Sequence, residues 1–331
     1  MRAPEFWHEP PGLIAGLLAP FGAAFDAASR LRRAVARPYS APVPVICVGN
    51  LVAGGSGKTP VVLSLAELLA ARGTAAHVVT RGYGGRLAGP VRVDLSRHAA
   101  LEVGDEPLLI AARAPCWVAR DRAAGVRAAT EAGAKAILLD DGFQNPSIAK
   151  DLSLVVVDAG YGFGNGRVIP AGPLREPVNT GLTRADAVVL IGGECEPFPG
   201  RYTVIHAALR TIEGERFASA RIVAFAGIGR PEKFFASLRA LGATLALAQP
   251  FPDHHPFCDR EIAQLREVAE REGAQLVTTA KDWVRLPPTL RAGIEVLEVE
   301  ILWRDPDAVQ HLLSDCVLRR HDRSHSGVAR G

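Results

Sequence analysis

The 331-residue sequence has few cysteines, little net charge and no long apolar run. Its five cysteines lie far apart, form no C-x-x-C pair and are odd in number, which argues against a zinc site and a disulfide framework. This usage fits a reducing, cytosolic compartment. Because no stretch of about 20 uninterrupted apolar residues occurs, the sequence predicts no membrane-spanning helix.

The small net charge also limits the possible partners. Lysine and arginine number 38 against 35 aspartate and glutamate residues. This excess is too small for a protein that binds by neutralising nucleic-acid phosphates, so we expect no nucleic-acid partner. The 33 glycines and 24 prolines follow no fixed period, which excludes a repeat fold, and the apolar content of 48% is that of an ordinary globular protein.

The hydrophobic pattern predicts two α/β domains. From residue 43, short apolar runs alternate with helical stretches that end at glycine, as in a doubly wound, mostly parallel sheet. A second, smaller set of the same kind begins near residue 221. The predicted strands are 43–48, 76–80, 136–139, 152–157 and 187–191 in the first set and 222–226, 244–248 and 275–279 in the second. The predicted helices are 61–72, 120–132, 231–241 and 260–272.

Residues 12–37 form an amphipathic pattern. Large apolar side chains recur on one side of a helical wheel, while Arg30, Arg33 and Arg37 lie opposite. Arg32 falls inside the apolar arc and is expected to reach water along its stem. Pro20 interrupts the pattern, which predicts two linked helical segments. The apolar positions are Leu13, Ile14, Leu17, Leu18, Phe21, Phe25, Leu31 and Val35.

Three interpretations of this segment compete: a signal peptide, a helix packed on the core and a helix lying in a membrane surface. The signal peptide is disfavoured because Glu5 and Glu9 precede the apolar run and no small-residue cleavage site precedes the basic cluster. Amphipathic helices pack on a protein core more often than they lie in a membrane surface, which favours the packed helix. The basic flank would attract anionic lipid by about 1 kcal/mol per charge, so packing and membrane binding both stay open.

A glycine-rich loop between a predicted strand and a predicted helix indicates a phosphate-binding loop, or P-loop. The sequence from residue 49 reads GNLVAGGSGKTP, and its backbone N–H groups would surround phosphate oxygens. Lys58 would place a charge on the β- and γ-phosphates, and Thr59 would offer a hydroxyl to Mg²⁺. The strict pattern has glycine where this chain has Val52, so the loop entrance is expected to differ. The predicted nucleotide-binding residues are Ala53, Gly54, Gly55, Ser56, Gly57, Lys58 and Thr59.

Acidic residues supply the other half of a nucleotide site. Asp140 and Asp141 end a predicted strand, where carboxylates commonly hold the Mg²⁺ of a nucleoside triphosphate. Asp105 and Glu106 form another pair, and Asp253, His254 and His255 are consecutive. A kinase needs such a group to orient an attacking hydroxyl, but Asp105 fits a helix N-cap equally well, and the histidines fit a metal site or a surface loop. Sequence spacing does not bring residues 105 and 254 together.

The ordered motifs resemble those of the tetraacyldisaccharide 4′-kinases, the lipid A 4′-kinases of Gram-negative bacteria. The resemblance extends from about residue 7 to residue 286, and family members also carry residues other than glycine at the position of Val52. The motifs are GNLVAGGSGKTP, TRGYGG at 80–85, GDEP at 104–107, DDGFQ at 140–144, GNGRVIPAGPLREP at 164–177, DHHPF at 253–257 and TAKD at 279–282.

The resemblance implies that ATP and Mg²⁺ are used to phosphorylate the 4′-hydroxyl of tetraacyldisaccharide 1-phosphate, which yields lipid IV-A. It also implies a peripheral or monotopic enzyme whose N-terminal helix lies in the cytoplasmic face of the inner membrane, and we expect a monomer. The implied catalytic residues are Asp105, His254, Lys58 and Asp141, with Thr59, Glu106, Asp140 and Asp141 around Mg²⁺. The implied substrate contacts are Tyr83, Asn165 and Arg167.

These considerations predict four segments: a membrane-surface helix at 1–37, a P-loop kinase domain at 38–205, a smaller α/β domain at 206–320 and a loose tail at 321–331. The alternative to the kinase is a soluble P-loop ATPase or a metallochaperone-type switch, in which hydrolysis drives a conformational change. A lipid requirement for ATP turnover would separate the two.

Overall fold

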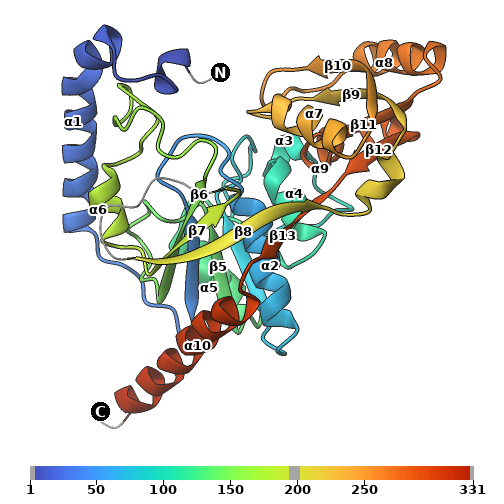
Figure 1. Ribbon diagram of the computed structural model, residues 1–331. Coiled ribbons are helices and arrows are strands. Elements are labelled where there is room, and N and C mark those ends of the chain that lie inside the picture. Colours follow the sequence, from blue (N-terminus) through green and yellow to red (C-terminus); the bar gives the residue numbers. More distant parts are fainter. Residues whose placement is uncertain (1–3, 194–201, 329–331) are drawn as a thin grey trace.

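The computed structural model describes residues 4–193 and 202–328 and contains two α/β units that lie side by side (Figure 1). The strands of the larger sheet are β1 (Val45–Gly49), β2 (Ala76–Thr80), β3 (Val91–Arg92), β4 (Cys116–Val118), β5 (Ala136–Asp140), β6 (Leu152–Asp158), β7 (Ala187–Ile191), β8 (Thr203–Thr211) and β13 (Val299–Trp303). The strands of the smaller sheet are β9 (Arg221–Ala226), β10 (Thr244–Pro250), β11 (Gln275–Thr279) and β12 (Ile294–Leu297).

Helices connect and cover both sheets. The α-helices are α1 (Leu13–Val35), α2 (Lys58–Ala70), α3 (Ala100–Val103), α4 (Asp105–Ala111), α5 (Arg122–Glu131), α6 (Val178–Leu182), α7 (Pro231–Ala240), α8 (Asp259–Arg271), α9 (Ala280–Arg285) and α10 (Pro306–Val328). The predicted doubly wound α/β fold with a second, smaller α/β unit is confirmed by this arrangement.

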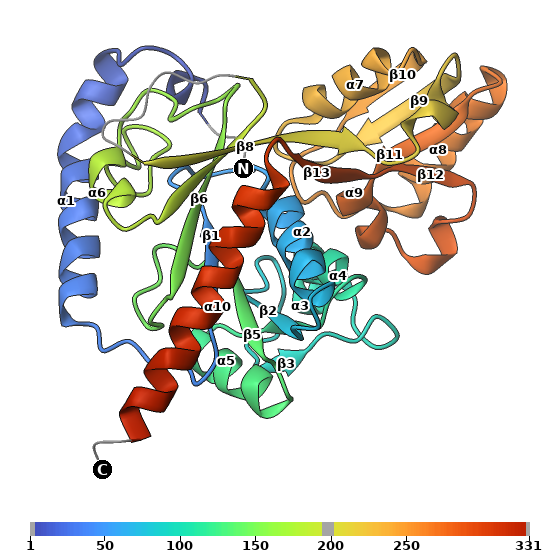
Figure 2. The ribbon, with the colours of Figure 1, turned by 60° about the horizontal axis from the view of Figure 1, so that its bottom comes forward.

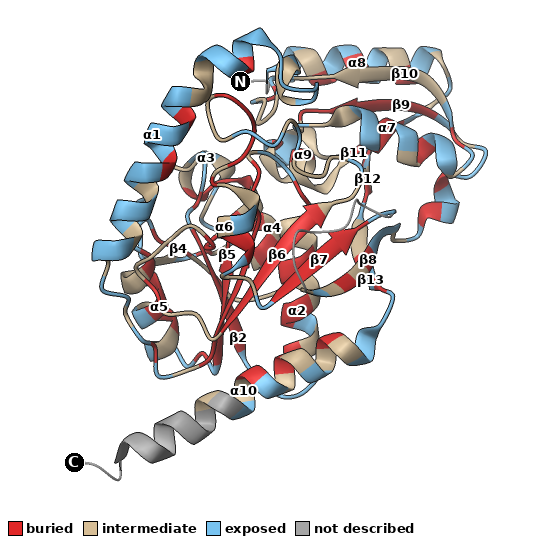
Figure 3. Cartoon of the chain, turned by 60° about the vertical axis from the view of Figure 1, so that its left-hand side comes forward, coloured by how far each residue is buried: buried red, intermediate tan, exposed pale blue. Residues whose placement is uncertain are grey.

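The larger sheet places the P-loop strand at its centre. Its strand order is β13-β8-β7-β6-β1-β5-β2-β4-β3, and among the described strands only β3 and β13, at the two edges, run antiparallel to their neighbours. Strands β1, β2, β5 and β7 are buried along their whole length, as their continuous apolar sequences predict (Figure 3). Since β1 lies between β5 and β6, residues that follow these three strands meet at one edge of the sheet.

Helices on the two faces of this sheet form separate hydrophobic cores. Helices α2, α4 and α10 contribute to the core on one face, and α5 and α6 contribute to the core on the other. Figure 2 shows α2 and α10 on the same face of the sheet. Arg72, just beyond α2, donates to the backbone and side-chain oxygens of Gln310 at 3.2 and 2.7 Å, which fixes α10 against the larger sheet.

The smaller sheet has the order β10-β9-β11-β12 and is parallel throughout. Phe234, Phe235 and Leu238 of α7 pack on one of its faces, while Ile262 and Leu265 of α8 pack on the other. Buried aromatic and aliphatic side chains therefore give this unit a core of its own.

The chain passes between the two sheets through β8 and β13. Strand β8 continues to Thr211, beyond the predicted boundary at residue 205, because it pairs in parallel with β7 and antiparallel with β13. Residues 299–316 were predicted to belong to the smaller domain, but β13 and α10 pack on the larger sheet. The tail was predicted to be loose from residue 321, whereas α10 runs to Val328. We propose domain bounds that follow the two sheets.

The N-terminal segment is one continuous helix, so the predicted break at Pro20 is wrong. Pro20 is exposed, and the carbonyl group that its missing N–H leaves unpaired lies on a helix face open to water. Ala15, Gly22 and Asp26 are buried, whereas most of the large apolar side chains are exposed. Seven of the eight predicted apolar positions are exposed: Leu13, Ile14, Leu17, Phe21, Phe25, Leu31 and Val35.

Two arginines that were predicted to lie opposite the apolar positions contact acidic side chains of the protein. Arg30 bonds Asp26 at 2.8 Å, and Arg33 lies 3.4 Å from the buried carboxylate of Glu176. Arg32 is exposed, as expected, and its guanidinium also donates to the backbone oxygen of Gln144 at 3.4 Å. Within the described part of the chain, no helix is long and apolar enough to span a bilayer.

We predict that Gly49→Ala destabilises the protein, because the new Cβ would lie 2.4 Å from Cβ of the buried Phe143. Such overpacking costs about 1–3 kcal/mol. Gly16→Ala is the matched control, since no other atom lies within 4 Å of its Cβ and alanine favours a helix by about 1 kcal/mol. Thermal unfolding should show a lower midpoint for Gly49→Ala and an unchanged or higher one for Gly16→Ala; equal midpoints would contradict the packing.

Candidate active site

The P-loop occupies the turn between β1 and α2. Gly54 and Gly57 adopt positive φ angles of 119° and 84°, which side chains other than glycine rarely allow. The buried amide of Asn50 donates to Ser56 Oγ at 2.9 Å and holds the two ends of the loop together. Lys58 begins α2, and its Nζ lies 3.7 Å from Asp141 Oδ1. The loop and the acidic strand end therefore meet, as predicted.

The loop entrance differs from the strict pattern for a structural reason. Val52 is buried and forms an antiparallel bridge with Leu174. The neighbouring Ala53 N–H donates to the Pro173 oxygen at 2.7 Å, and the Arg175 N–H donates to the Leu51 oxygen at 2.8 Å. A strand-like bridge needs no glycine, so valine is accommodated at this position.

The two carboxylates at the end of β5 have different environments. Asp140 is buried and accepts a 3.3 Å bond from Thr80, while its Oδ1 has no hydrogen-bond partner. Burial, Glu106 and Asp141 raise the pKa of Asp140 above its ordinary value. Burial also opposes ionisation of Asp141, but Lys58 and Arg175, the latter bonded at 2.8 Å, lower its pKa. Asp141 is thus already paired, whereas Asp140 keeps an oxygen available for a cation.

Asp105 lies at the contact between the two units. Its buried carboxylate Oδ2 lies 3.0 Å from His254 Nδ1 and accepts a 2.8 Å bond from Arg285 Nε, and its Oδ1 accepts the backbone N–H of Glu106 at 2.9 Å. Burial alone would raise the pKa of Asp105, but the bond from His254 and the charges of Lys281 and Arg285 hold it well below its ordinary value. The structure therefore brings together two predicted residues that are 149 positions apart.

Local backbone geometry fixes both partners. Asp105 begins α4 directly after Gly104, whose φ is +92° and where a Cβ would lie 2.5 Å from the Tyr83 backbone oxygen. His254 adopts φ +58°, and its N–H donates to the Gly227 oxygen at 3.1 Å. The backbone of Asp141 also lies in the left-handed region, with φ +53°. Strained backbone held at two predicted catalytic residues is typical of functional sites.

A second contact between the units lies beside the first. Lys281 of α9 bonds Glu106 Oε1 at 3.0 Å, and burial, which would lower the pKa of Lys281, is outweighed by Glu106 and Asp105, which raise it. Asp282 accepts bonds from Gly227 N–H and Arg285, at 3.0 and 2.9 Å, and so orients the guanidinium that reaches Asp105. In the sequence, Lys281 stands out only as part of the TAKD motif, and no motif or pattern marks Arg285 as a functional residue.

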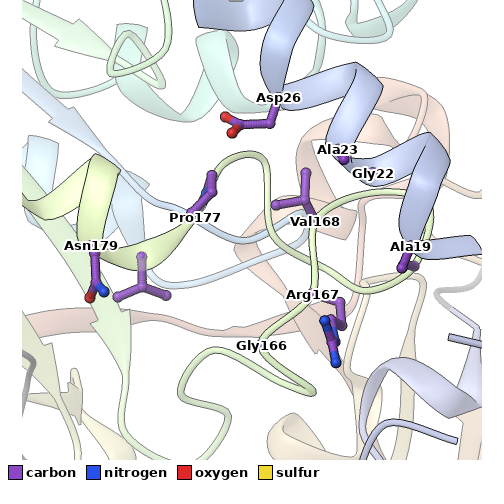
Figure 4. Close-up of a pocket in the computed structure, with 11 residues that line it drawn as sticks. Ala19, Gly22, Ala23, Asp26, Gly166, Arg167, Val168, Pro177 and Asn179 are labelled. Carbon is purple, nitrogen blue, oxygen red and sulfur yellow. The ribbon is translucent and has the colours of Figure 1, made fainter. Parts of the chain in front are cut away.

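The predicted substrate residues divide into two places. Tyr83 is exposed, and its ring centroid lies 5.4 Å from that of His254. The amide of Asn165 bonds the backbone oxygens of Phe6 and Ala171, at 3.2 and 3.0 Å, which shapes the loop. Arg167 lines a cavity of about 460 Å³ between α1 and this loop (Figure 4). No described contact joins Asn165 or Arg167 to Asp105, so their substrate contacts stay predictions.

A metal ion at this site would need ligands in addition to the protein's side chains. In the described ranges, no group of three His, Cys, Asp or Glu side chains could hold a metal ion, so the consecutive histidines form no such cluster. His255 instead bonds Glu261 at 2.9 Å and stacks on Phe251, with ring centroids 4.8 Å apart. Cys47, Cys116, Cys258 and Cys316 are not joined in disulfides, and Cys195 lies outside the described residues. Mg²⁺ commonly binds with one or two carboxylates plus phosphate oxygens, which the free oxygen of Asp140 fits.

Comparison with known proteins gives a consistent result. The family model described as "Tetraacyldisaccharide-1-P 4'-kinase" matches residues 14–317. Proteins named tetraacyldisaccharide 4′-kinase from Rhodospirillum centenum and Dinoroseobacter shibae are 54% and 57% identical, over 98% and 93% of this chain and 100% and 96% of their own. A crystal structure titled as LpxK from Aquifex aeolicus in complex with ATP has a TM-score of 0.77 and 27% identity, and the match covers 92% of this chain and all of that one.

We predict that Asp105→Asn destabilises the protein most at neutral pH. A carboxyl whose pKa is depressed by folding contributes stability above its unfolded pKa, near 3.8, and loses it as pH falls towards the folded pKa. Removing one partner of a buried ion pair costs about 3 kcal/mol or more. Unfolding measured from pH 7 to pH 3 should show the wild type and the variant converging below pH 4; a constant difference would contradict this assignment.

Proposed function

This chain belongs to the tetraacyldisaccharide 4′-kinase family, and we propose from that premise how its cleft performs the reaction. It is an ATP-dependent kinase that phosphorylates the 4′-hydroxyl of tetraacyldisaccharide 1-phosphate in lipid A synthesis. Two observations support our assignment of roles. Asp105 and His254 lie 3.0 Å apart, and Glu106, the residue after Asp105, acts electrostatically on the same Asp140 as Lys58 of the P-loop. An ATPase or a metallochaperone-type switch transfers phosphate to water, so it needs no carboxylate that orients a sugar hydroxyl.

We propose that residues 53–59 bind the phosphates of ATP. The loop N–H groups lie at the start of α2, where the helix dipole favours anions, and Lys58 adds a positive charge. Asp140 and Thr59 would hold Mg²⁺ together with phosphate oxygens, with Asp141 and Glu106 close by. When bound, the cation neutralises charge on the β- and γ-phosphates. Asp141, paired with Lys58 and Arg175, orients the lysine.

Asp105 is proposed to orient the 4′-hydroxyl and to take its proton. A loose phosphoryl-transfer transition state demands little of the base before the new bond forms, so a carboxylate that is ionised at all physiological pH suffices. His254 holds this carboxylate from the smaller unit, and Arg285 fixes the same oxygen from α9. Tyr83, exposed beside His254, is positioned to contact the sugar. The main contribution of these residues is positioning.

The lipid substrate is proposed to be taken from the cytoplasmic face of the inner membrane. Leu17 and Phe21 of α1 are 77% and 64% exposed, which is unusual for large apolar side chains on one helix face. This outward face favours the membrane interpretation over packing on the core. The cavity lined by Arg167 lies on the opposite side of α1, next to Ala19 and Gly22, where a lipid headgroup could pass from the surface to the loop (Figure 4).

We predict that Asp105→Ala and Lys58→Ala each lower lipid-dependent phosphate transfer by at least about 100-fold, because general-base and phosphate contacts contribute factors of this size. An assay of phosphate transfer from ATP to tetraacyldisaccharide 1-phosphate in mixed micelles measures this loss of activity. Arg221→Ala, which breaks the exposed Arg221–Glu272 pair of the smaller unit, is the control and should retain activity. ATP hydrolysis that needs no lipid and survives Asp105→Ala would support the switch instead.

We also predict that Leu17→Ser combined with Phe21→Ser weakens binding to anionic vesicles by at least about tenfold, since each buried side chain contributes about 1.5–3 kcal/mol. Both side chains are exposed, so folding should be unaffected. Leu302→Ser with Leu318→Ser removes two exposed leucines outside α1 and should leave binding unchanged. Equal co-sedimentation of the two double variants would refute the membrane role of α1.

A further inference from the structure

A cluster of a cation and an aromatic ring lies beside the P-loop and takes no part in the mechanism above. Arg230 precedes α7 of the smaller unit and reaches across to the larger one. Its Nη2 donates to the backbone oxygen of Gly55 at 2.6 Å and to Asp158 Oδ2 at 2.7 Å. Its guanidinium lies over the ring of Tyr161, 5.0 Å from the centroid. Arg230 of the smaller unit thus contacts the P-loop of the larger unit at Gly55.

The strand order indicates which part of ATP would lie there. Lys58 and Asp141 meet on the β5 side of β1, and Asp105 belongs to α4, which leads into β4 on that same side. The γ-phosphate must lie on this side, because it is transferred to a hydroxyl at Asp105. The nucleoside then extends in the other direction, towards β6. Asp158 is the last residue of β6.

The chemistry of the cluster suits a planar, uncharged ring. A guanidinium is flat and stacks readily on aromatic rings and on bases. That of Arg230 is held by two hydrogen bonds and by Tyr161, so little side-chain freedom remains to be lost on binding. Asp158 also accepts from Lys233; burial would raise the pKa of Asp158, but Lys233 and Arg230 lower it, so the anchoring carboxylate stays ionised.

We propose that Arg230 and Tyr161 form the nucleoside end of the ATP site, with the adenine ring stacked on the guanidinium of Arg230. This inference rests on the proposed function, because it takes the direction of the phosphate chain from Asp105. The smaller unit then contributes to both ends of the reaction site: His254 at the acceptor hydroxyl and Arg230 at the base.

Two other roles for Arg230 give different experimental results. As a brace between the units, the residue would act through its charge and hydrogen bonds, which lysine could replace. As a contact to the γ-phosphate, it would favour ATP over ADP. A stacking role requires the planar group and depends only on the nucleoside, which ATP and ADP share.

Calorimetric titration with ATP and with ADP, in the presence of Mg²⁺ and without lipid, separates these roles. We expect Arg230→Ala and Arg230→Lys each to raise Kd about tenfold, and by the same factor for both nucleotides, because both variants lose the planar cation on which the base stacks. Arg239→Ala, an exposed arginine on the same helix α7, is the matched control and should bind like the wild type.

Three results would overturn the proposal. Full affinity in Arg230→Lys would make the residue a brace, a loss confined to ATP would make it a γ-phosphate contact, and an unchanged Kd in Arg230→Ala would leave it no role in binding. Failure of the proposed function is recognised separately, since a wild type that binds ATP but transfers no phosphate to the lipid refutes the kinase assignment alone.

Discussion

One contact between the two α/β units determines the geometry of the site: the carboxylate of Asp105 against the imidazole of His254, at 3.0 Å. Each residue is held by its own unit, Asp105 by the turn at Gly104 and His254 by a left-handed backbone bonded to Gly227. Arg285 bonds the same carboxylate oxygen and balances its charge in a buried setting. A buried carboxylate with two such partners stays ionised and fixed in place, which is what the orientation of a weak nucleophile requires.

The two units divide the chemistry of the reaction. The larger sheet supplies the P-loop and the acidic end of β5, and their neighbouring positions follow from the parallel pairing of β1 with β5. The smaller unit supplies cationic side chains and an imidazole from its loops and from α9. Strands β8 and β13 pair antiparallel and carry the chain between the sheets, so this ribbon and the polar contacts at Asp105 and Glu106 together fix the relative placement of the units. The outward apolar face of α1 lies on the larger unit.

Sequence reasoning recovered the features that depend on local pattern. Continuous apolar runs located β2, β7 and β11 to the residue, and the glycine loop placed Lys58 next to a helix, although α2 begins at Lys58 and not at residue 61 as predicted. What it missed depends on contacts between distant segments. The return of the chain at β13, the continuity of α1 through Pro20 and the approach of Arg285 to Asp105 leave no periodic signal, because each is decided by packing against residues far away in sequence.

The most direct test of the account is a double-mutant cycle on the contact between the units, with Asp105→Asn, His254→Gln and the double variant compared in kcat for lipid phosphorylation. If the carboxylate and the imidazole act as one unit, the second substitution should add little to the loss caused by the first, as is found for catalytic groups that work together. Independent, multiplicative losses would contradict the account, because each residue would then act without the other.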